Sequence, residues 1–242
     1  LTETDALGNV TRWTYNSRGQ VLSEINALGN AATYTYSPSG NLLSTQDALG
    51  NVTKHSYDLR GLRLSTTDAN NKTTRYEYDN YGNLTRQVDA LGNDTTYTYN
   101  NLGKRLTETQ KITTAYGLVE LVTEWKYDSE GRVKSVIDAE GYITNYEYDA
   151  NDNRTAVVDA TRRRTEYVYN EKGLLVDIIY PDKNPNHLTQ NLKLTNTYDK
   201  AGRLVTRTDE SGRVTLYKYD ELGRLIETIY PDKTPENELD NP

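Results

Sequence analysis

Carboxylates are the groups in this sequence that could most readily do chemistry. Many of them recur at one place, because the residue directly after each of a series of regularly spaced tyrosines is Asp, Asn or Ser. Asp58, Asp79 and Asp220 are examples. A glycosidase needs two unlike carboxyl groups about 5 to 9 Å apart across a cleft. A residue that recurs in copy after copy is typical of a turn, whereas an active site is unique. We therefore predict that these residues build turns and that the chain is not an enzyme.

Metal ligands are the second kind of candidate. The chain has two histidines, His55 and His187, and no Cys, which argues against a transition-metal site. Calcium takes six to eight oxygen ligands at one point, and the Asp-rich turns contain no Asp-x-Asp-x-Asp run. We therefore predict no metal and no other cofactor. His55 stands where most other copies have an aromatic ring, so we interpret it as a ring substitute within a sheet.

Tyrosine is the dominant aromatic side chain, with 21 copies against two Trp, and the chain has no Phe or Met. Rows of exposed rings could stack on sugars, which is one interpretation. The other is that they are cross-strand ladders, which contribute roughly 0.2 to 1 kcal/mol per pair. We favour ladders, because a tyrosine ring has an apolar body and a hydroxyl that needs a partner.

An internal repeat explains the tyrosine spacing. Ten tyrosines follow one another at intervals of 21 residues, with two longer intervals of 28 and 29: Tyr15, Tyr36, Tyr57, Tyr78, Tyr99, Tyr127, Tyr148, Tyr169, Tyr198 and Tyr219. In nine of the ten copies a glycine follows the tyrosine by four residues: Gly19, Gly40, Gly61, Gly82, Gly103, Gly131, Gly173, Gly202 and Gly223. Asp152 takes that place in the remaining copy. These residues are the structural marks of the repeat.

Each repeat is predicted to be a β-hairpin. An aromatic-x-Tyr pair such as Trp13 and Tyr15 places two rings on one strand face, and the following Asx and Gly residues form a turn. A short alternating strand and a second turn of the Asp-Ala-Leu-Gly-Asn type, such as residues 47–51, lead into the next copy. The expected fold is therefore all-β: a long antiparallel meander of about twenty short strands. Because strands twist, we expect it to curl into a spiral or shell segment.

We expect residues 1–242 to form one array of ten copies with two insertions. The first lies near residues 110–124 and is predicted to be a longer hairpin. The second lies near residues 180–194 and contains Pro181, Pro185 and His187, so we predict a loop, because Pro cannot donate to a ladder. We favour structural bends over binding sites in both places.

The repeated pattern resembles the Rhs/YD repeat. The best local matches are Tyr127 to Ala150 and Tyr198 to Asp232, and the resemblance covers essentially the whole chain. That family includes large exported bacterial proteins, among them polymorphic toxins and the B–C components of insecticidal toxin complexes, and the animal teneurins. The resemblance implies a spiralling β-sheet that closes into a hollow shell around a C-terminal toxin. It therefore implies that the chain's partners are the rest of its shell and the enclosed toxin.

Two family features are missing, since the chain has neither the Asp-Pro self-cleavage motif nor a non-repeat toxin domain. We interpret it as a fragment of a larger protein that is secreted or carried on the cell surface. The alternative is an extracellular carbohydrate- or protein-binding repeat module with a surface glycan as its ligand. A net charge of −7 argues against nucleic acid, and no apolar run is long enough to span a membrane. Exposed edge strands predict edge-to-edge self-association.

Overall fold

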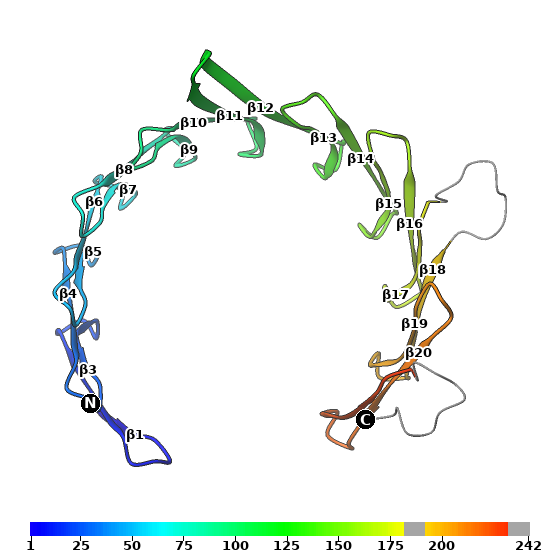
Figure 1. Cartoon of the computed structure of the whole chain (residues 1–242), viewed down its shortest axis with the longest axis horizontal. Coiled ribbons are helices and arrows are strands. Elements are labelled where there is room, and N and C mark those ends of the chain that lie inside the picture. The colour runs from blue at the N-terminus through cyan, green and yellow to red at the C-terminus, as the bar shows by residue number, and fades with distance from the viewer. Residues whose placement is uncertain (182–191, 232–242) are drawn as a thin grey trace. The chain divides into compact units, whose positions relative to one another are not determined.

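The computed structural model describes residues 1–181 and 192–231, and every helix or strand in these residues is a β-strand. The all-β antiparallel meander predicted from the sequence is confirmed. The chain divides into two compact units, Leu1–Glu124 and Trp125–Pro242, which we call unit 1 and unit 2. The division falls within a strand, β12 (Gly117–Tyr127). In each unit the strands follow one another along a curved strip (Figure 1).

The strands are short, mostly five or six residues. Those that begin in unit 1 are β1 (Thr2–Thr4), β2 (Val10–Tyr15), β3 (Val21–Ile25), β4 (Ala31–Tyr36), β5 (Leu42–Gln46), β6 (Val52–Tyr57), β7 (Arg63–Thr67), β8 (Thr73–Tyr78), β9 (Leu84–Val88), β10 (Asp94–Tyr99), β11 (Arg105–Thr114) and β12. Those of unit 2 are β13 (Val133–Ile137), β14 (Ile143–Tyr148), β15 (Arg154–Val158), β16 (Arg164–Tyr169), β17 (Leu175–Ile179), β18 (Lys193–Tyr198), β19 (Leu204–Thr208), β20 (Val214–Tyr219) and β21 (Leu225–Ile229).

Pairing follows chain order within each unit. In unit 1 each strand from β1 to β12 is antiparallel to the next, and in unit 2 the same holds from β13 to β21. The strip is therefore one layer thick. Among the described residues only Ala156, Leu194 and Ser135 are buried, so neither unit has a conventional hydrophobic core.

Two kinds of turn alternate, and both have the same internal hydrogen bonds. We call the turns that follow the repeat tyrosines Y-turns, and those that lead into the next copy D-turns. In the Y-turn at residues 58–62, the Asp58 carboxylate accepts hydrogen bonds from the backbone N–H groups of Arg60 and Leu62, both at 2.9 Å. The Gly61 N–H donates to the Asp58 carbonyl at 3.0 Å. A hydrogen-bonded type I turn closed by a residue of positive φ is a common three-residue hairpin loop.

Positive φ explains why Gly recurs in these turns. Gly61 has φ of 85°, a value that costs a residue with a Cβ about 1 to 2 kcal/mol. Where the sequence lacks Gly, the backbone still adopts this conformation: Asn71, Asp152 and Arg162 have φ of 60°, 64° and 64°. The turn geometry is therefore imposed by the hairpin, and Gly relieves its strain.

A β-bulge recurs at the same place in nine described strand pairs, which the sequence analysis did not predict. In the β2–β3 pair, Thr14 faces Ser23 but Tyr15 faces Val21, so Leu22 is an extra residue. The same shift directly before the repeat tyrosine occurs in eight other pairs joined by Y-turns. A bulge bends its strand and increases the twist. Repetition at one place in these pairs therefore bends the strip in a constant direction.

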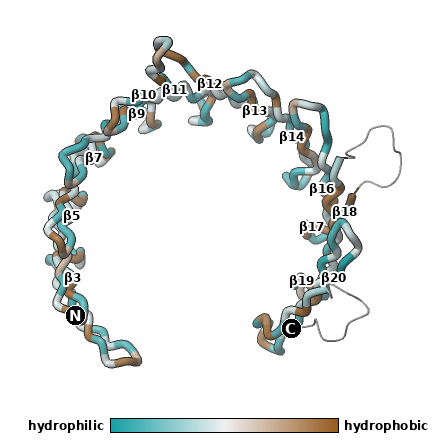
Figure 2. Tube along the Cα trace, viewed as in Figure 1, coloured by the Kyte–Doolittle hydropathy of each residue, from teal (hydrophilic) through white to brown (hydrophobic). Residues whose placement is uncertain are grey.

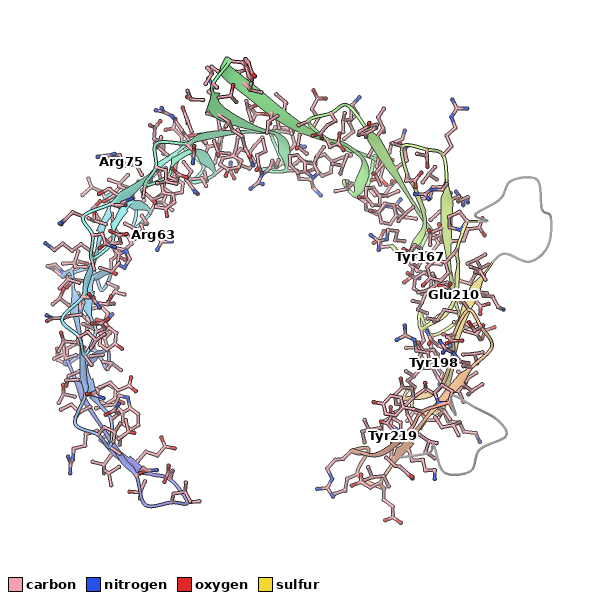
Figure 3. The ribbon with its side chains drawn as sticks, viewed as in Figure 1. Arg63, Arg75, Tyr167, Tyr198, Glu210 and Tyr219 are labelled. Atoms are coloured by element: carbon pink, nitrogen blue, oxygen red, sulfur yellow. The ribbon has the colours of Figure 1, made fainter. Side chains whose placement is uncertain are left out.

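The strip has two chemically different faces. Side chains alternate along a strand, so Trp13 and Tyr15 share one face, and Thr14 lies on the other with its partner Ser23. We call these the tyrosine face and the polar face. Figure 2 shows the resulting alternation of hydrophobic and hydrophilic positions along each strip. In unit 1, Arg63 and Arg75 project from opposite sides of the ribbon, with Arg63 on the concave side (Figure 3).

The two insertions differ in how far the structure describes them. The first is a long hairpin, as predicted: β11 and β12 stay paired up to Thr114 and Gly117. Of the second, residues 182–191 lie outside the described part of the chain, and the loop prediction there, with Pro185 and His187, stays a prediction. Its two ends are joined, because the Tyr180 N–H donates to the Leu192 carbonyl at 2.9 Å.

Candidate functional site

The ten repeat tyrosines occupy equivalent places, since each is the last residue of an even-numbered strand from β2 to β20. Six of their hydroxyls donate to a backbone carbonyl of the preceding repeat: Tyr36 to Val21 at 3.0 Å, Tyr78 to Arg63 at 3.0 Å, Tyr99 to Leu84 at 2.8 Å, Tyr148 to Val133 at 3.0 Å, Tyr169 to Arg154 at 3.1 Å, and Tyr198 to Leu175 at 2.7 Å. The tyrosines therefore connect consecutive copies.

Each hydroxyl bridges a place where the ladder between two copies has ended. The β9–β10 pairing includes only three pairs and stops at Arg86 and Thr96. Beyond that point the strands diverge, and the Tyr99 hydroxyl reaches the Leu84 carbonyl. A buried carbonyl without a partner is costly. Burial raises the pKa of Tyr78 and of Tyr169, so these hydroxyls keep the proton that they donate.

Arginines stack on rings of the tyrosine face. The guanidinium of Arg105 lies 4.5 Å from the ring centre of Tyr97, and that of Arg203 lies 5.0 Å from the ring centre of Tyr219. Figure 3 labels Tyr219, with Tyr167 and Tyr198, along the strip of unit 2. Such contacts contribute on the order of 0.5 to 1 kcal/mol at exposed sites. They reinforce the tyrosine face as a ladder that holds the sheet together.

Consecutive Y-turns are also joined side by side, whereas no hydrogen bond joins one D-turn to the next in the described part of the chain. The Gln20 amide donates to the Gly40 carbonyl at 2.8 Å, and the Arg60 guanidinium donates to the Asp79 carbonyl at 2.8 Å. An added Cβ at the D-turn glycines Gly8 and Gly92 would meet nothing within 4 Å. One long side of each strip is therefore a stack of turns, and the other is a row of separate tips.

An open groove lies between neighbouring Y-turns. One of about 710 Å³ in unit 1 is lined by Tyr81, Tyr97 and Tyr99. A second, of about 450 Å³ in unit 2, is lined by Asn196 and Tyr198 at the equivalent positions of another repeat. Equivalent positions of two different repeats therefore line the two grooves.

The polar face is held by matched pairs that the sequence analysis missed. Hydroxyl pairs join neighbouring strands at the same place in five repeats: Thr14 with Ser23 at 2.7 Å, Thr35 with Ser44 at 2.6 Å, Ser56 with Ser65 at 2.6 Å, Thr98 with Thr107 at 2.7 Å, and Thr197 with Thr206 at 2.6 Å. The recurrence of small polar residues just before the repeat tyrosine and eight residues after it was the signal that could have revealed this row.

Ion pairs take the place of hydroxyls in other repeats. Ala156 faces Glu147 on one side and Glu166 on the other. The Arg164 guanidinium reaches both carboxylates, at 2.9 Å from Glu147 Oε2 and 2.8 Å from Glu166 Oε1. A small residue at position 156 leaves room for that bridge, which accounts for its complete burial.

The remaining candidates have local roles. The nine repeat glycines all lie in Y-turns and have positive φ. His55 lies in β6 with Nδ1 3.1 Å from the Thr66 hydroxyl, and burial followed by the nearby Arg63 charge lowers its pKa. His187 lies outside the described residues. In residues 1–181 and 192–231 no three acidic or histidine side chains converge as a metal site would require, and no helix there could cross a membrane.

Removing one tyrosine hydroxyl tests the connection between repeats. Tyr99→Phe leaves the Leu84 carbonyl without its donor, so we expect the free energy of unfolding to fall by about 1 kcal/mol. Tyr15→Phe is the matched control, because the Tyr15 hydroxyl makes no hydrogen bond to any of the described residues. Chemical denaturation compares the two variants. Equal effects would contradict the assigned role of the hydroxyl.

The turn carboxylates should make stability depend on pH. The hydrogen bond from the Thr161 hydroxyl, and next the backbone N–H of Arg163, lower the pKa of Asp159 to about 2 from its ordinary 3.8. Because the folded pKa is the lower one, this stabilisation is present above about pH 4 and is lost as the pH falls towards 2.

Asp159→Asn replaces the carboxylate with a neutral amide. The amide oxygen can still accept the turn hydrogen bonds, as that of Asn26 does in its own D-turn. We expect the variant to be less stable than the wild type at neutral pH. The difference between their denaturant midpoints should shrink steadily as the pH falls from about 4 through 2. Midpoints that differ by a constant amount across this range would contradict the assignment.

Comparison with known protein families agrees with the repeat geometry. The RHS repeat model matches residues 1–31, 15–52, 36–73, 57–94, 81–119, 127–164, 148–185 and 198–235. No curated protein matches the chain.

Three solved structures are similar to this chain in fold. The TcdB2-TccC3-Cdc42 structure matches with a TM-score of 0.67 and 18% identity, over 100% of this chain and 16% of that chain. The structure of TcdB2-TccC3 without its hypervariable C-terminal region matches with a TM-score of 0.53 and 17% identity, over 95% of this chain and 16% of that chain. The Tc holotoxin pore of Photorhabdus luminescens matches with a TM-score of 0.52 and 16% identity, over 100% of this chain and 14% of that chain. This chain therefore spans about one-sixth of the length of these relatives.

The family model covers most of the chain, and its successive matches follow the spacing of the repeat tyrosines. The chain belongs to the RHS repeat family.

Proposed function

We propose that this chain is a structural segment of the β-shell of an exported Rhs-type protein, and that the shell encloses a C-terminal toxin. The observation that carries the proposal is the single-layer strip, in which only three of the described residues are buried. A layer without a core is suited to act as a wall, because both of its faces remain free to meet other material. The proposed role is architectural, and no residue is assigned a catalytic function.

The two faces support a wall with an inside and an outside. Arg63 lies on the concave side of the strip of unit 1 (Figure 3), 5.4 Å from the ring centre of Tyr76 on the tyrosine face. Arg75 lies on the opposite, polar face with Ser65. We propose that the tyrosine face lines the interior of the shell and that the polar face meets solvent.

The relatives support the same proposal. One similar structure is of a Tc holotoxin pore, and another is of TcdB2-TccC3 without its hypervariable C-terminal region. The location that follows from this proposal is outside the producing cell. The surface-glycan hypothesis stays a prediction, and the groove lined by Tyr81, Tyr97 and Tyr99 is where tyrosine rings would meet a sugar.

Cysteine labelling tests the inside–outside assignment, because the chain has no native Cys. Arg63→Cys and Arg75→Cys are a matched pair, since both arginines are exposed in this chain and lie on opposite faces. In the full-length protein that the proposal implies, a bulky maleimide should label position 75 at least about tenfold faster than position 63. In the isolated chain the two rates should be similar.

Equal labelling of both positions in the full-length protein would contradict an enclosed tyrosine face. Cryo-electron microscopy of the same protein should show a hollow particle with this strip in its wall. A particle without a cavity would exclude the shell.

A further inference from the structure

The strands of unit 2 from β13 to β21 carry their carboxylates on the polar face alone. These carboxylates are Glu147, Glu166, Asp177 and Glu227. Each strand cation of that face lies within 3.2 Å of one of them: Arg164 beside Glu147, Lys193 beside Asp177, and Lys218 beside Glu227. The positive charges of the polar face are therefore matched within the sheet.

The cations on the tyrosine face of the same strands have no such partner. Lys134, Arg154 and Arg207 are exposed, and none of them forms an ion pair with another residue of the described chain. We call these three side chains the cationic row. It is opposite in sign to the whole chain, which has a net charge of −7. Strand pairing fixes the face of each member: Arg154 is opposite Tyr148, Arg207 is opposite Asn196, and Lys134 alternates with Ser135 of the polar face.

Two tyrosine rings hold Arg154 in place. Its guanidinium lies 5.8 Å from the ring centre of Tyr146 and 5.3 Å from that of Tyr167, which belong to the strands on either side. Figure 3 labels Tyr167. Ring contacts leave the N–H donors of a guanidinium unused, and none of these donors is bonded to another described residue. Arg154 is therefore held in position with its donors available, and a carboxylate can accept two parallel hydrogen bonds from such a group.

Apolar side chains lie between the members of the cationic row. Val157 faces Tyr146, and Ile178 faces Tyr167, on the same side of the sheet. Strands β13 and β15 are two strand spacings apart, roughly 10 Å, and β15 and β19 are four spacings apart, roughly 19 Å. A nucleic acid spaces its phosphates far more closely than this. A polypeptide with carboxylates between apolar residues matches both the spacing and the apolar surface.

We propose that the cationic row binds an extended acidic segment of a polypeptide, with carboxylates at the three cations and apolar side chains between them. At about 3.3 Å per residue, a segment of roughly nine residues spans the row. The source of the segment rests on the proposed function: because the tyrosine face lines the interior of the shell there, the segment belongs to the enclosed polypeptide. The binding itself needs only this chain.

Fluorescence anisotropy with synthetic peptides and the full 242-residue chain tests the proposal. The acidic probe is a fluorescein-labelled peptide that is long enough to span the row and contains Glu, Ser and Val in equal numbers. Two matched peptides replace every Glu with Gln or with Lys. An oligothymidylate of similar length is the nucleic-acid probe.

Two variants with the same change in net charge separate the two faces. Each replaces three cations with Gln, so a difference between them reports the position of the charge and not its amount. Circular dichroism checks that both retain the β-sheet. If the tyrosine-face variant loses the sheet, the single variant Arg154→Gln takes its place. The tyrosine-face variant carries Lys134→Gln, Arg154→Gln and Arg207→Gln, and the polar-face control carries Arg164→Gln, Lys193→Gln and Lys218→Gln.

We expect the wild type to bind the acidic peptide at least about tenfold more tightly than either matched peptide. Added salt should weaken that binding by screening the charges. The tyrosine-face variant should bind the acidic peptide at least about tenfold more weakly than the wild type, and Arg154→Gln alone at least about threefold more weakly. The polar-face control should keep the wild-type affinity.

A wild type that does not distinguish the three peptides would overturn the proposal. Equal weakening in both variants would overturn it too, because binding would then follow net charge. Tighter binding of oligothymidylate than of the acidic peptide would also overturn it, since the row would then select nucleic acid. These results leave the hollow shell to be judged separately, by cysteine labelling and microscopy of the full-length protein.

Discussion

The constraint on which this structure depends is that a single layer of strands has no interior. Each described strand contacts only the strands next to it in the chain, so each repeat is stabilised by its own turns and by its two neighbours. In such arrays stability is roughly the sum of unit and neighbour terms. The ladder between copies is short, and it is extended by tyrosine hydroxyls, stacked arginines and joined Y-turns.

This constraint also connects the repeat to its proposed role. In a protein that folds around a core, one face of each sheet is buried in that core. In a single-layer strip both faces of the sheet are uncovered, so one of them can face enclosed material. The recurring bulge bends the strip in one direction. In the proposed shell the tyrosine face and the polar face meet different surroundings. Because the bulge recurs in nine described repeats, a longer array would extend the proposed wall with the same bend.

Most of the fold could be predicted from particular residues. The spacing of Tyr15, Tyr36 and the later tyrosines, together with the turn glycines, indicated hairpins, and the structure has them. The bulge beside each tyrosine could not be predicted, because it depends on a register shift between two strands and no residue type marks it. The Thr14–Ser23 type of pair needed the register as well, since its members lie nine residues apart. The carbonyl that each tyrosine hydroxyl reaches, such as that of Leu84, could not be predicted either. It depends on the place where the strand pairing between two copies ends.

Deleting one whole repeat tests most directly whether neighbour contacts hold the strip together. Removal of residues 58–78 joins Tyr57 to Asp79 and so preserves the Tyr–Asp junction and the phase of the repeat. Hydrogen exchange measured on the shortened chain should show strands β2 to β4 and β14 to β16 as protected as before, because no strand there loses a neighbour. Loss of protection throughout these strands would contradict the account, since it would show that the fold depends on contacts beyond adjacent repeats.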